Sequence, residues 1–392
     1  MYDDLQINHN DLDEDFRQAS NGLNLIQALE SISEIIGDSD EITPQNAALI
    51  NLVVGTATDG SILDSSQFVP ATESIGNSKA LRKMIESKLS VATEGLSDHI
   101  KSMFGKTEDN FSKLSDKIKH EQEVFGGIQE RVNRSEHKDG KISIYLPGTV
   151  KINNSSELLK HVKDNTRKIH TVVEVANSLI DQAKNPFFKL MWVKGENPEF
   201  HTLWIDKINT ELNSVINSFA AKKISASDLK DVYIGRLVGL PTSVEISIPS
   251  HVNYSGFKSA VKSENDSFFT LHPEKKRIAE YFSFNVAGTG ETFGQQQEIQ
   301  YKSSDIDSIF DEISAVQSFT IESTKNIESL WGNFGKVLMA IYTLGISILA
   351  WHISVYRKLA FLCMHIVKEM IKLLDQVNDF NMRLAGSIRS SI

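Results

Sequence analysis

The chain has 392 residues, 40% of them hydrophobic, so it can bury at least one sizeable core, which excludes a globally disordered protein. Eight prolines and 22 glycines are few for this length, which favours helices over a turn-rich β-sandwich. The formal net charge of -10 averages two unlike parts, because residues 1–73 hold fourteen acids and one base, about −13, whereas residues 74–392 hold 40 bases and 37 acids, about +3.

The acidic first part of the chain predicts two helices followed by a linker. Apolar residues recur with a helical period over residues 17–36. Thr43 and Pro44 suit the cap and the first position of a second, short helix. Residues 56–78 are polar and are broken by glycines and a proline, which is typical of an exposed, protease-accessible linker. We therefore assign residues 1–73 to an acidic helical leader with a linker.

The next part, residues 74–230, predicts a helical domain with one short strand. Its first helical pattern contains glycines at which we expect interruptions, namely Gly95, Gly105, Gly126 and Gly127. Alternation of apolar and polar residues predicts a half-buried strand over 142–146. The helices expected here are 79–132, 155–184 and 198 to about 223.

The sequence changes character at residues 231–300. Val244, Ile246 and Ile248 alternate with polar residues, and we expect a small antiparallel sheet in this subdomain. The helical period returns after residue 300 and continues almost to the end, which predicts two long helices forming a hairpin or a kinked rod over 301–392. The predicted fold class is mainly α, a helical bundle with long C-terminal helices and a small antiparallel β subdomain.

One apolar run leaves two interpretations open. Residues 337–356 contain no Asp, Glu, Lys or Arg, and about twenty residues can just cross a bilayer. Thr343, Ser347 and His352 dilute the run, and amphipathic sequence continues beyond it, as in a long helix of a bundle. The segment is therefore either a buried core helix or a membrane-inserting helix.

The usual sequence signatures of enzyme chemistry are incomplete. The glycine-rich turn at residues 288–294 has the spacing GxGxxxG and is not followed by the helix that a dinucleotide site needs. His365 and Glu369 lie one helical turn apart, but a metal site needs three or four ligands. The single cysteine, Cys363, lies in an apolar run, which predicts a buried, inert thiol. We therefore name no catalytic, cofactor-binding or metal-ligating residue, and we expect neither an enzyme nor a cofactor.

A short pattern of a small residue, any residue and glutamate occurs twice near the change in charge. The two copies, each with the residue that follows it, are Ala71, Thr72, Glu73 and Ser74, and Ala92, Thr93, Glu94 and Gly95. The pattern is loose, so its placement carries the weight. The first copy lies in the predicted linker and the second in a predicted helix, which is less accessible to a protease. We expect processing after Glu73 or after Glu94.

An acidic, helical leader that ends in this pattern resembles the propeptides of head proteins of large tailed bacteriophages, which a prohead protease removes after assembly. The resemblance covers residues 1–73, or 1–94 if the second copy is used. It implies a structural, internal head protein of the virion. The leader would target the chain to the prohead through capsid or core proteins, and the mature body would be packaged beside DNA and ejected with it.

The expected location and partners follow from this resemblance. The N-terminal residues lack the basic and apolar regions of a secretory signal, so we expect synthesis in the host cytoplasm and a final location inside the capsid. Short basic runs, such as the one over residues 79–88, allow non-specific contact with packaged DNA. The main alternative is a membrane-active, pore-forming or channel protein that inserts residues 337–356. A third is an enzyme built on the 231–292 sheet, for which the sequence offers only unassigned polar residues.

Overall fold

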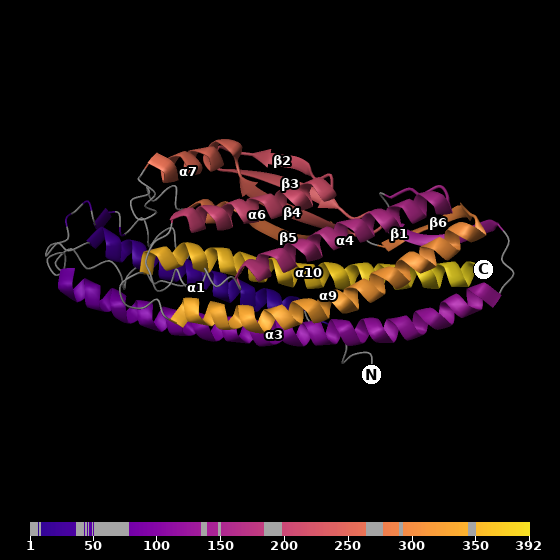
Figure 1. Ribbon diagram of the computed structural model, residues 1–392, viewed down its shortest axis with the longest axis horizontal. Helices are drawn as coiled ribbons and strands as arrows, with labels where there is room; N and C mark the ends of the chain where they lie inside the picture. Colours follow the sequence, from indigo (N-terminus) through magenta and orange to yellow (C-terminus); the bar gives the residue numbers. More distant parts are fainter. Residues whose placement is uncertain are drawn as a thin grey trace. The chain divides into compact units, whose positions relative to one another are not determined.

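The computed structural model describes residues 9–36, 78–134, 139–147, 150–183, 198–263, 277–289, 293–343 and 350–392, with a few single positions before residue 51. In these ranges the protein is mainly helical with two small antiparallel sheets (Figure 1), which confirms the predicted fold class. The chain divides into two compact units. Unit 1 comprises Met1–Ile7, Glu108–Phe334 and Phe361–Ile392, and unit 2 comprises Asn8–Thr107 and Gly335–Ala360.

The elements follow one another along the chain as long helices with short strands between them. The helices of the described ranges are α1 (His9–Ile36), α3 (Ser78–Arg134), α4 (Ser155–Ala183), α6 (Pro198–Ser218), α7 (His251–Ser263), the 3-10 helix η3 (Arg277–Tyr281), α9 (Ser303–Thr343) and α10 (Ala350–Ser391). The strands are β1 (Gly140–Pro147), β2 (Lys222–Ala226), β3 (Lys230–Arg236), β4 (Thr242–Pro249), β5 (Ser283–Gly288) and β6 (Phe293–Tyr301).

The core of unit 2 lies between α1 and the first half of α3. The face of α1 that is buried follows the helical period and consists of Leu12, Phe16, Ala19, Leu23, Ile26, Leu29, Ile32 and Ile36. Leu29, Ile32 and Ile36 form one apolar cluster with Leu81 and Ile85 of α3. Because Asp15 near the start of α1 pairs with Lys106, the two helices run in opposite directions. The predicted leader helix is confirmed over residues 17–36 and begins earlier, at His9.

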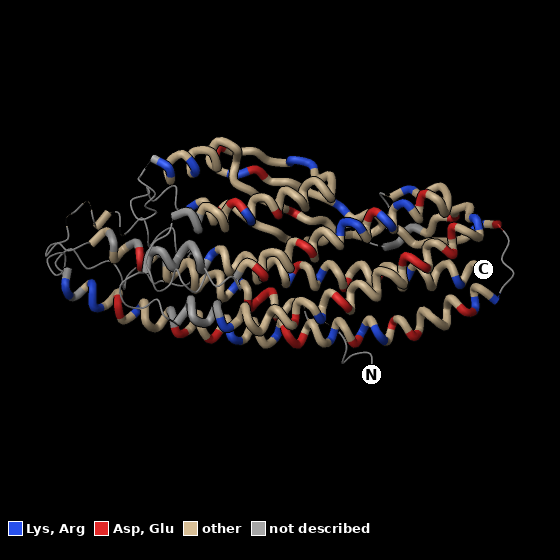
Figure 2. Tube along the Cα trace, in the orientation of Figure 1, with Lys and Arg blue, Asp and Glu red and all other residues tan. Residues whose placement is uncertain are grey.

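Helix α3 is continuous from Ser78 to Arg134, so the predicted interruptions at Gly95, Gly105, Gly126 and Gly127 are wrong. All four glycines are exposed, and a methyl group added at any of them would meet no atom within 4 Å. Each costs about 1 kcal/mol relative to alanine, and burial of the opposite face outweighs that cost. Lys and Arg are interspersed with Asp and Glu along the helix (Figure 2).

In unit 1, β2, β3, β4 and β5 form one antiparallel sheet in that order, which confirms the predicted sheet. Helix α6 packs against β4, and α4 packs along α6. The predicted end of the helix near residue 223 is wrong, because α6 ends at Ser218 and β2 begins at Lys222. Ala220 has a left-handed φ of 45°, and the N–H of Ala221 bonds the carbonyl of Ile216, which together terminate the helix.

A second sheet in unit 1 joins two strands that are far apart in the sequence. The predicted strand 142–146 is confirmed as β1, and it pairs antiparallel with β6 so that Gly140 faces Tyr301. The glycine-rich turn connects β5 to β6, so a strand follows it where a dinucleotide site needs a helix. Helix α7, inside the predicted sheet region, was not anticipated.

The long helices α9 and α10 lie side by side and antiparallel in unit 1. Gln317 donates to Met382 Sδ at 3.3 Å, and Thr320 Oγ1 accepts from Asn378 at 3.0 Å. This confirms the predicted hairpin, and the kinked rod is wrong.

The apolar run 337–356 includes the last residues of α9, which ends at Thr343, and the first residues of α10, which begins at Ala350. Residues 344–349, and the side chains of 337–357, lie outside the described part of the chain. Within the described ranges, no helix combines the length and apolar character needed to cross a membrane. Whether the run meets core or lipid therefore stays a prediction.

Candidate processing sites and buried polar clusters

The two predicted processing sites differ in what the structure describes. Residues 71–74 lie outside the described ranges, whereas Ala92, Thr93, Glu94 and Gly95 lie inside α3. Glu94 and Gly95 are exposed, but Leu96 is 1% exposed and packs near Gly22 of α1. A protease that needs an extended substrate can cut after Glu94 only when this part of α3 unfolds locally. Access at the second site is therefore linked to the packing of α1.

The leader helix is held on α3 by polar as well as apolar contacts. Asp15 forms an ion pair with Lys106 at 2.6 Å and accepts a hydrogen bond from Ser102 at 3.3 Å. On the outer face, Arg17 and Gln18 both donate to Glu14, and the Arg17 bond is the main reason why the pKa of Glu14 is lowered to about 2. A cut after Glu73 alone would leave α1 bound to α3 through these non-covalent contacts.

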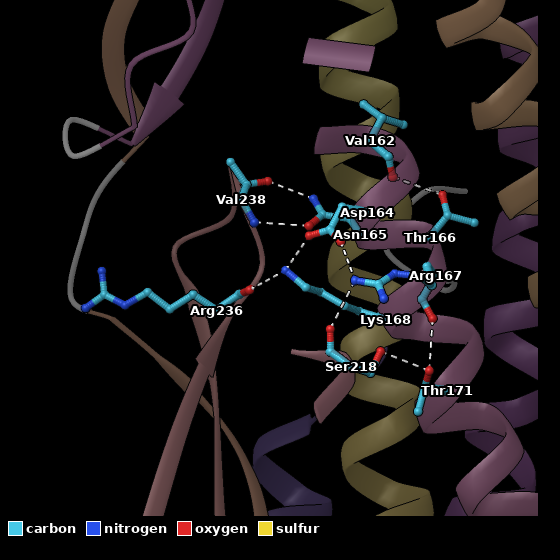
Figure 3. A network of polar contacts seen from close by, with 10 residues as sticks. All are labelled: Val162, Asp164, Asn165, Thr166, Arg167, Lys168, Thr171, Ser218, Arg236 and Val238. Carbon is cyan, nitrogen blue, oxygen red and sulfur yellow. Dashed lines mark hydrogen bonds and ion pairs between the residues drawn. The ribbon is translucent and has the colours of Figure 1, made fainter. Parts of the chain in front are cut away.

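A network of polar side chains on α4 fixes the turn between β3 and β4 (Figure 3). Asn165 is 3% exposed and bonds both backbone groups of Val238, donating to the carbonyl at 2.7 Å and accepting from the N–H at 3.0 Å. Lys168 donates to the carbonyl of Arg236 at 3.1 Å and pairs with Asp164 at 2.7 Å. The amide of Asn165 thus satisfies both backbone hydrogen-bonding groups of Val238, as a neighbouring strand would do in a sheet.

The same network joins α4 to the end of α6. Arg167 donates to Asp164 at 2.6 Å and to the carbonyl of Ser218 at 3.3 Å, and Thr171 donates to the hydroxyl of Ser218 at 3.0 Å. Burial alone would raise the pKa of Asp164, but hydrogen bonds from Lys168 and Arg167 lower it. Every partner in this network is a backbone or side-chain group of α4, the end of α6 or the turn after β3, so the network stabilises the packing of these elements.

A second polar cluster joins α3 to α10 around one ammonium group. Lys117 Nζ lies 2.7 Å from Asp375 and 2.6 Å from Asp379, and 4.0 Å from Glu121 on its own helix. Burial alone would lower the pKa of Lys117, but the two aspartates raise it and keep the ammonium charged. Burial is the largest effect on Glu121 and raises its pKa to about 7, against the opposing effect of Lys117.

Charged groups of α10 cover the edge strand β5. Glu369 Oε2 accepts from the N–H of Val286 at 2.8 Å, and Lys372 donates to the carbonyl of Val286 at 3.0 Å. Glu369 also pairs with Lys368 at 2.8 Å, and His365 Nε2 lies 2.8 Å from Asn285 Oδ1. These contacts satisfy backbone groups at one edge of the four-stranded sheet, which protects it from pairing with another chain.

The chemistry open to these groups is limited. In the part of the chain that the structure describes, no three His, Cys, Asp or Glu side chains converge to hold a metal ion. His365 and Glu369, weighed as a possible metal pair, instead contact β5. Cys363 is buried, as predicted, and burial raises the pKa of its thiol to about 12, so it is inert. Burial is also the first cause that raises the pKa of Tyr254, which donates to Asp206.

Comparisons with protein-family models, with curated proteins and with solved structures found no match for this chain.

Proposed function

We propose that the protein is a structural, internal head protein of a tailed-phage virion. An acidic leader targets it to the prohead, and a prohead protease removes that leader after Glu73 or Glu94. The observation that carries the proposal is the abrupt change of charge at the first copy of the Ala-Thr-Glu triplet, from about −13 before it to about +3 after it.

The charge gives the leader a physical role. A segment of about −13 is repelled by DNA and attracted to basic core or scaffold partners. Its removal reverses the sign of the net charge, from -10 for the whole chain to about +3 for residues 74–392. The mature body then tolerates packed DNA, makes weak, salt-sensitive contacts with it, and is ejected with it.

The placement of α1 supports a removable leader. Helix α1 belongs to unit 2, and its described partners, such as Leu81, Ile85 and Lys106, lie in the first half of α3. Unit 1 contains only Met1–Ile7 of the leader, and the rest of it is built from residues 108–334 and 361–392. Loss of the leader would expose the apolar face of the first half of α3 in unit 2. The role is non-enzymatic, and it needs no cofactor.

The proposal is tested by blocking each site in the phage that encodes the chain. Glu73→Ala, Glu94→Ala and the double variant are compared with Glu34→Ala, a leader glutamate that follows Ile32 and Ser33 and so does not fit the pattern. Purified particles are probed for the length of the chain. We expect Glu34→Ala to be processed normally and the double variant to keep its leader. Normal shortening of the double variant would refute both sites, and absence of the wild-type chain from particles would refute the virion role.

A further inference from the structure

The contact of α3, α9 and α10 in unit 1 contains a polar layer that is mostly buried, although the side chain of Asp379 is 42% exposed. We define this polar layer by Lys117, Glu121, Gln317, Thr320, Asp375, Asn378, Asp379 and Asn381. Asp375 and Asp379 face α3, whereas Asn378, between them on α10, bonds Thr320 of α9 at 3.0 Å. One turn of α10 thus meets polar groups on both neighbouring helices.

Lys117 cannot neutralise all three carboxylates around it. Its ammonium is within hydrogen-bond distance of Asp375 and Asp379, at 2.7 and 2.6 Å, but Glu121 lies 4.0 Å away. The side chain of Glu121 is only 8% exposed, so water cannot screen its charge effectively. When Glu121 is ionised, it is repelled by Asp375 and Asp379, and the hydrogen bonds of Lys117 are already directed at those two aspartates.

The layer also lacks hydrogen-bond donors. Among the described residues, four of its buried polar atoms have no hydrogen-bond partner, namely Glu121 Oε2, Gln317 Oε1, Asn378 Oδ1 and Asn381 Nδ2. Three of these atoms are acceptors and one is a donor. A proton on Glu121 would convert one unsatisfied acceptor of the layer into a donor and remove one negative charge at the same position.

We propose that Lys117, Glu121, Asp375 and Asp379 form a proton-controlled clasp between α3 and α10, which is tight while Glu121 carries a proton and loosens when Glu121 ionises. The charged groups that act on Glu121 are Lys117 on its own helix and the two aspartates of α10. The nearby contacts with α9 are neutral. They are a hydrogen bond from Gln122 to Ser318 and the packing of Phe125 on Phe310.

The direction of the pH effect follows from the protonation of Glu121. Its pKa is raised from 4.5 to about 7 in the folded chain, so the folded state keeps a proton that the opened state releases. The contribution of Glu121 to the stability of the clasp is therefore fully present below about pH 5, is lost as the pH rises towards about 7, and changes little above that. Because the closed clasp holds one proton more than the opened one, the equilibrium constant for opening rises about tenfold per pH unit within this window.

The test uses hydrogen exchange of the backbone amides of α3 and α10 in the full-length chain, corrected for intrinsic exchange. In the wild type, we expect opening around residues 117–125 to become about tenfold more frequent per pH unit between about pH 5 and pH 7. Glu121→Gln, which mimics the protonated form, should keep the protection and lose this pH dependence. Glu123→Gln on the same helix is the matched control, because its side chain is 83% exposed, and it should behave as the wild type does.

The same pH dependence in Glu121→Gln as in the wild type would overturn the clasp. Should that variant fail to fold, the carboxyl carbon resonances of glutamates in the wild type decide the matter. We expect one glutamate to titrate near pH 7. Titration of every glutamate below about pH 5.5 would overturn the proposal, because no buried proton would then be held.

Discussion

Replacing Asn165 by alanine should destabilise unit 1 by detaching the turn between β3 and β4 from α4. Asn165 is 3% exposed, and its amide makes two hydrogen bonds to Val238, at 2.7 and 3.0 Å (Figure 3). Both backbone groups of Val238 lose their partner at once, while the helix itself is unaffected. The same turn contains Gly239, which has a left-handed φ of 85° and lies close to Phe380, so it has little freedom to find new partners.

The expected cost is about 2.5 kcal/mol. Each hydrogen bond contributes about 1.5 kcal/mol, at the upper end of the usual range because the amide is buried. Alanine returns about 0.5 kcal/mol through its better helix propensity. The cost would be higher if the N–H and carbonyl of Val238 were left without partners in a fully buried site. Val238 is only half-buried, so water can reach both groups after the substitution.

Urea unfolding followed by circular dichroism measures the free energy of unfolding, and hydrogen exchange locates the loss. Lys163→Ala is the control, because Lys163 is exposed on the same helix. We expect the control within about 0.5 kcal/mol of the wild type. Faster exchange in Asn165→Ala should be centred on residues 236–240. A loss below about 0.5 kcal/mol, or one equal to that of the control, would refute the reasoning that this amide holds the turn.

The remaining predictions concern two glycines, the α1–α3 cluster and the polar contacts of Glu369. Gly126→Ala should stabilise α3 by about 0.5–1 kcal/mol, because the added methyl group would meet no atom within 4 Å. Gly235→Ala should cost about 1–3 kcal/mol, because its Cβ would lie 2.6 Å from Phe219 Cβ. In thermal unfolding, the two variants should shift the midpoint temperature in opposite directions. Ile32→Ala removes a fully buried side chain of the α1–α3 cluster and should cost about 2–5 kcal/mol, visible as faster exchange in unit 2 and not in unit 1. Glu369→Ala should cost about 3 kcal/mol and speed exchange in β5, because a buried ion pair and a backbone hydrogen bond are lost together; unchanged exchange there would contradict it.

Elements with a clear local period could be predicted from the sequence. The alternation over 142–146 gave β1, and the apolar spacing over 17–36 gave most of α1. In both cases one face is buried and the other is exposed, so the pattern of residue types records the environment directly. The pairing of β1 with β6 could not be predicted, because it depends on contacts between residues about 160 positions apart, such as Gly140 with Tyr301.

Local propensity misled the prediction where tertiary burial opposed it. The glycines of α3 suggested breaks. The helix nevertheless continues, because its opposite face carries buried apolar side chains such as Leu96 and Ile100. Near residue 220, two alanines and two lysines suggested more helix, but the left-handed Ala220 ends α6 and the chain turns into β2.

The polar clusters gave no readable signal in the sequence. Lys117 and Asp375 are separated by 258 positions, and each looks like an ordinary surface residue of an amphipathic helix. Asn165 lies inside a helix, where asparagine alone predicts neither burial nor a partner. One weak signal could have suggested these clusters. It is an acid or an amide at a position that the helical period assigns to the core.

The central claim is that an acidic leader is removed from a body of nearly neutral charge, and the intact mass of the chain isolated from virions tests it most directly. The account predicts a chain that begins at Ser74, or at Gly95 when the second triplet is used. A mass that corresponds to an intact chain beginning at Met1, in particles that have completed DNA packaging, would contradict it.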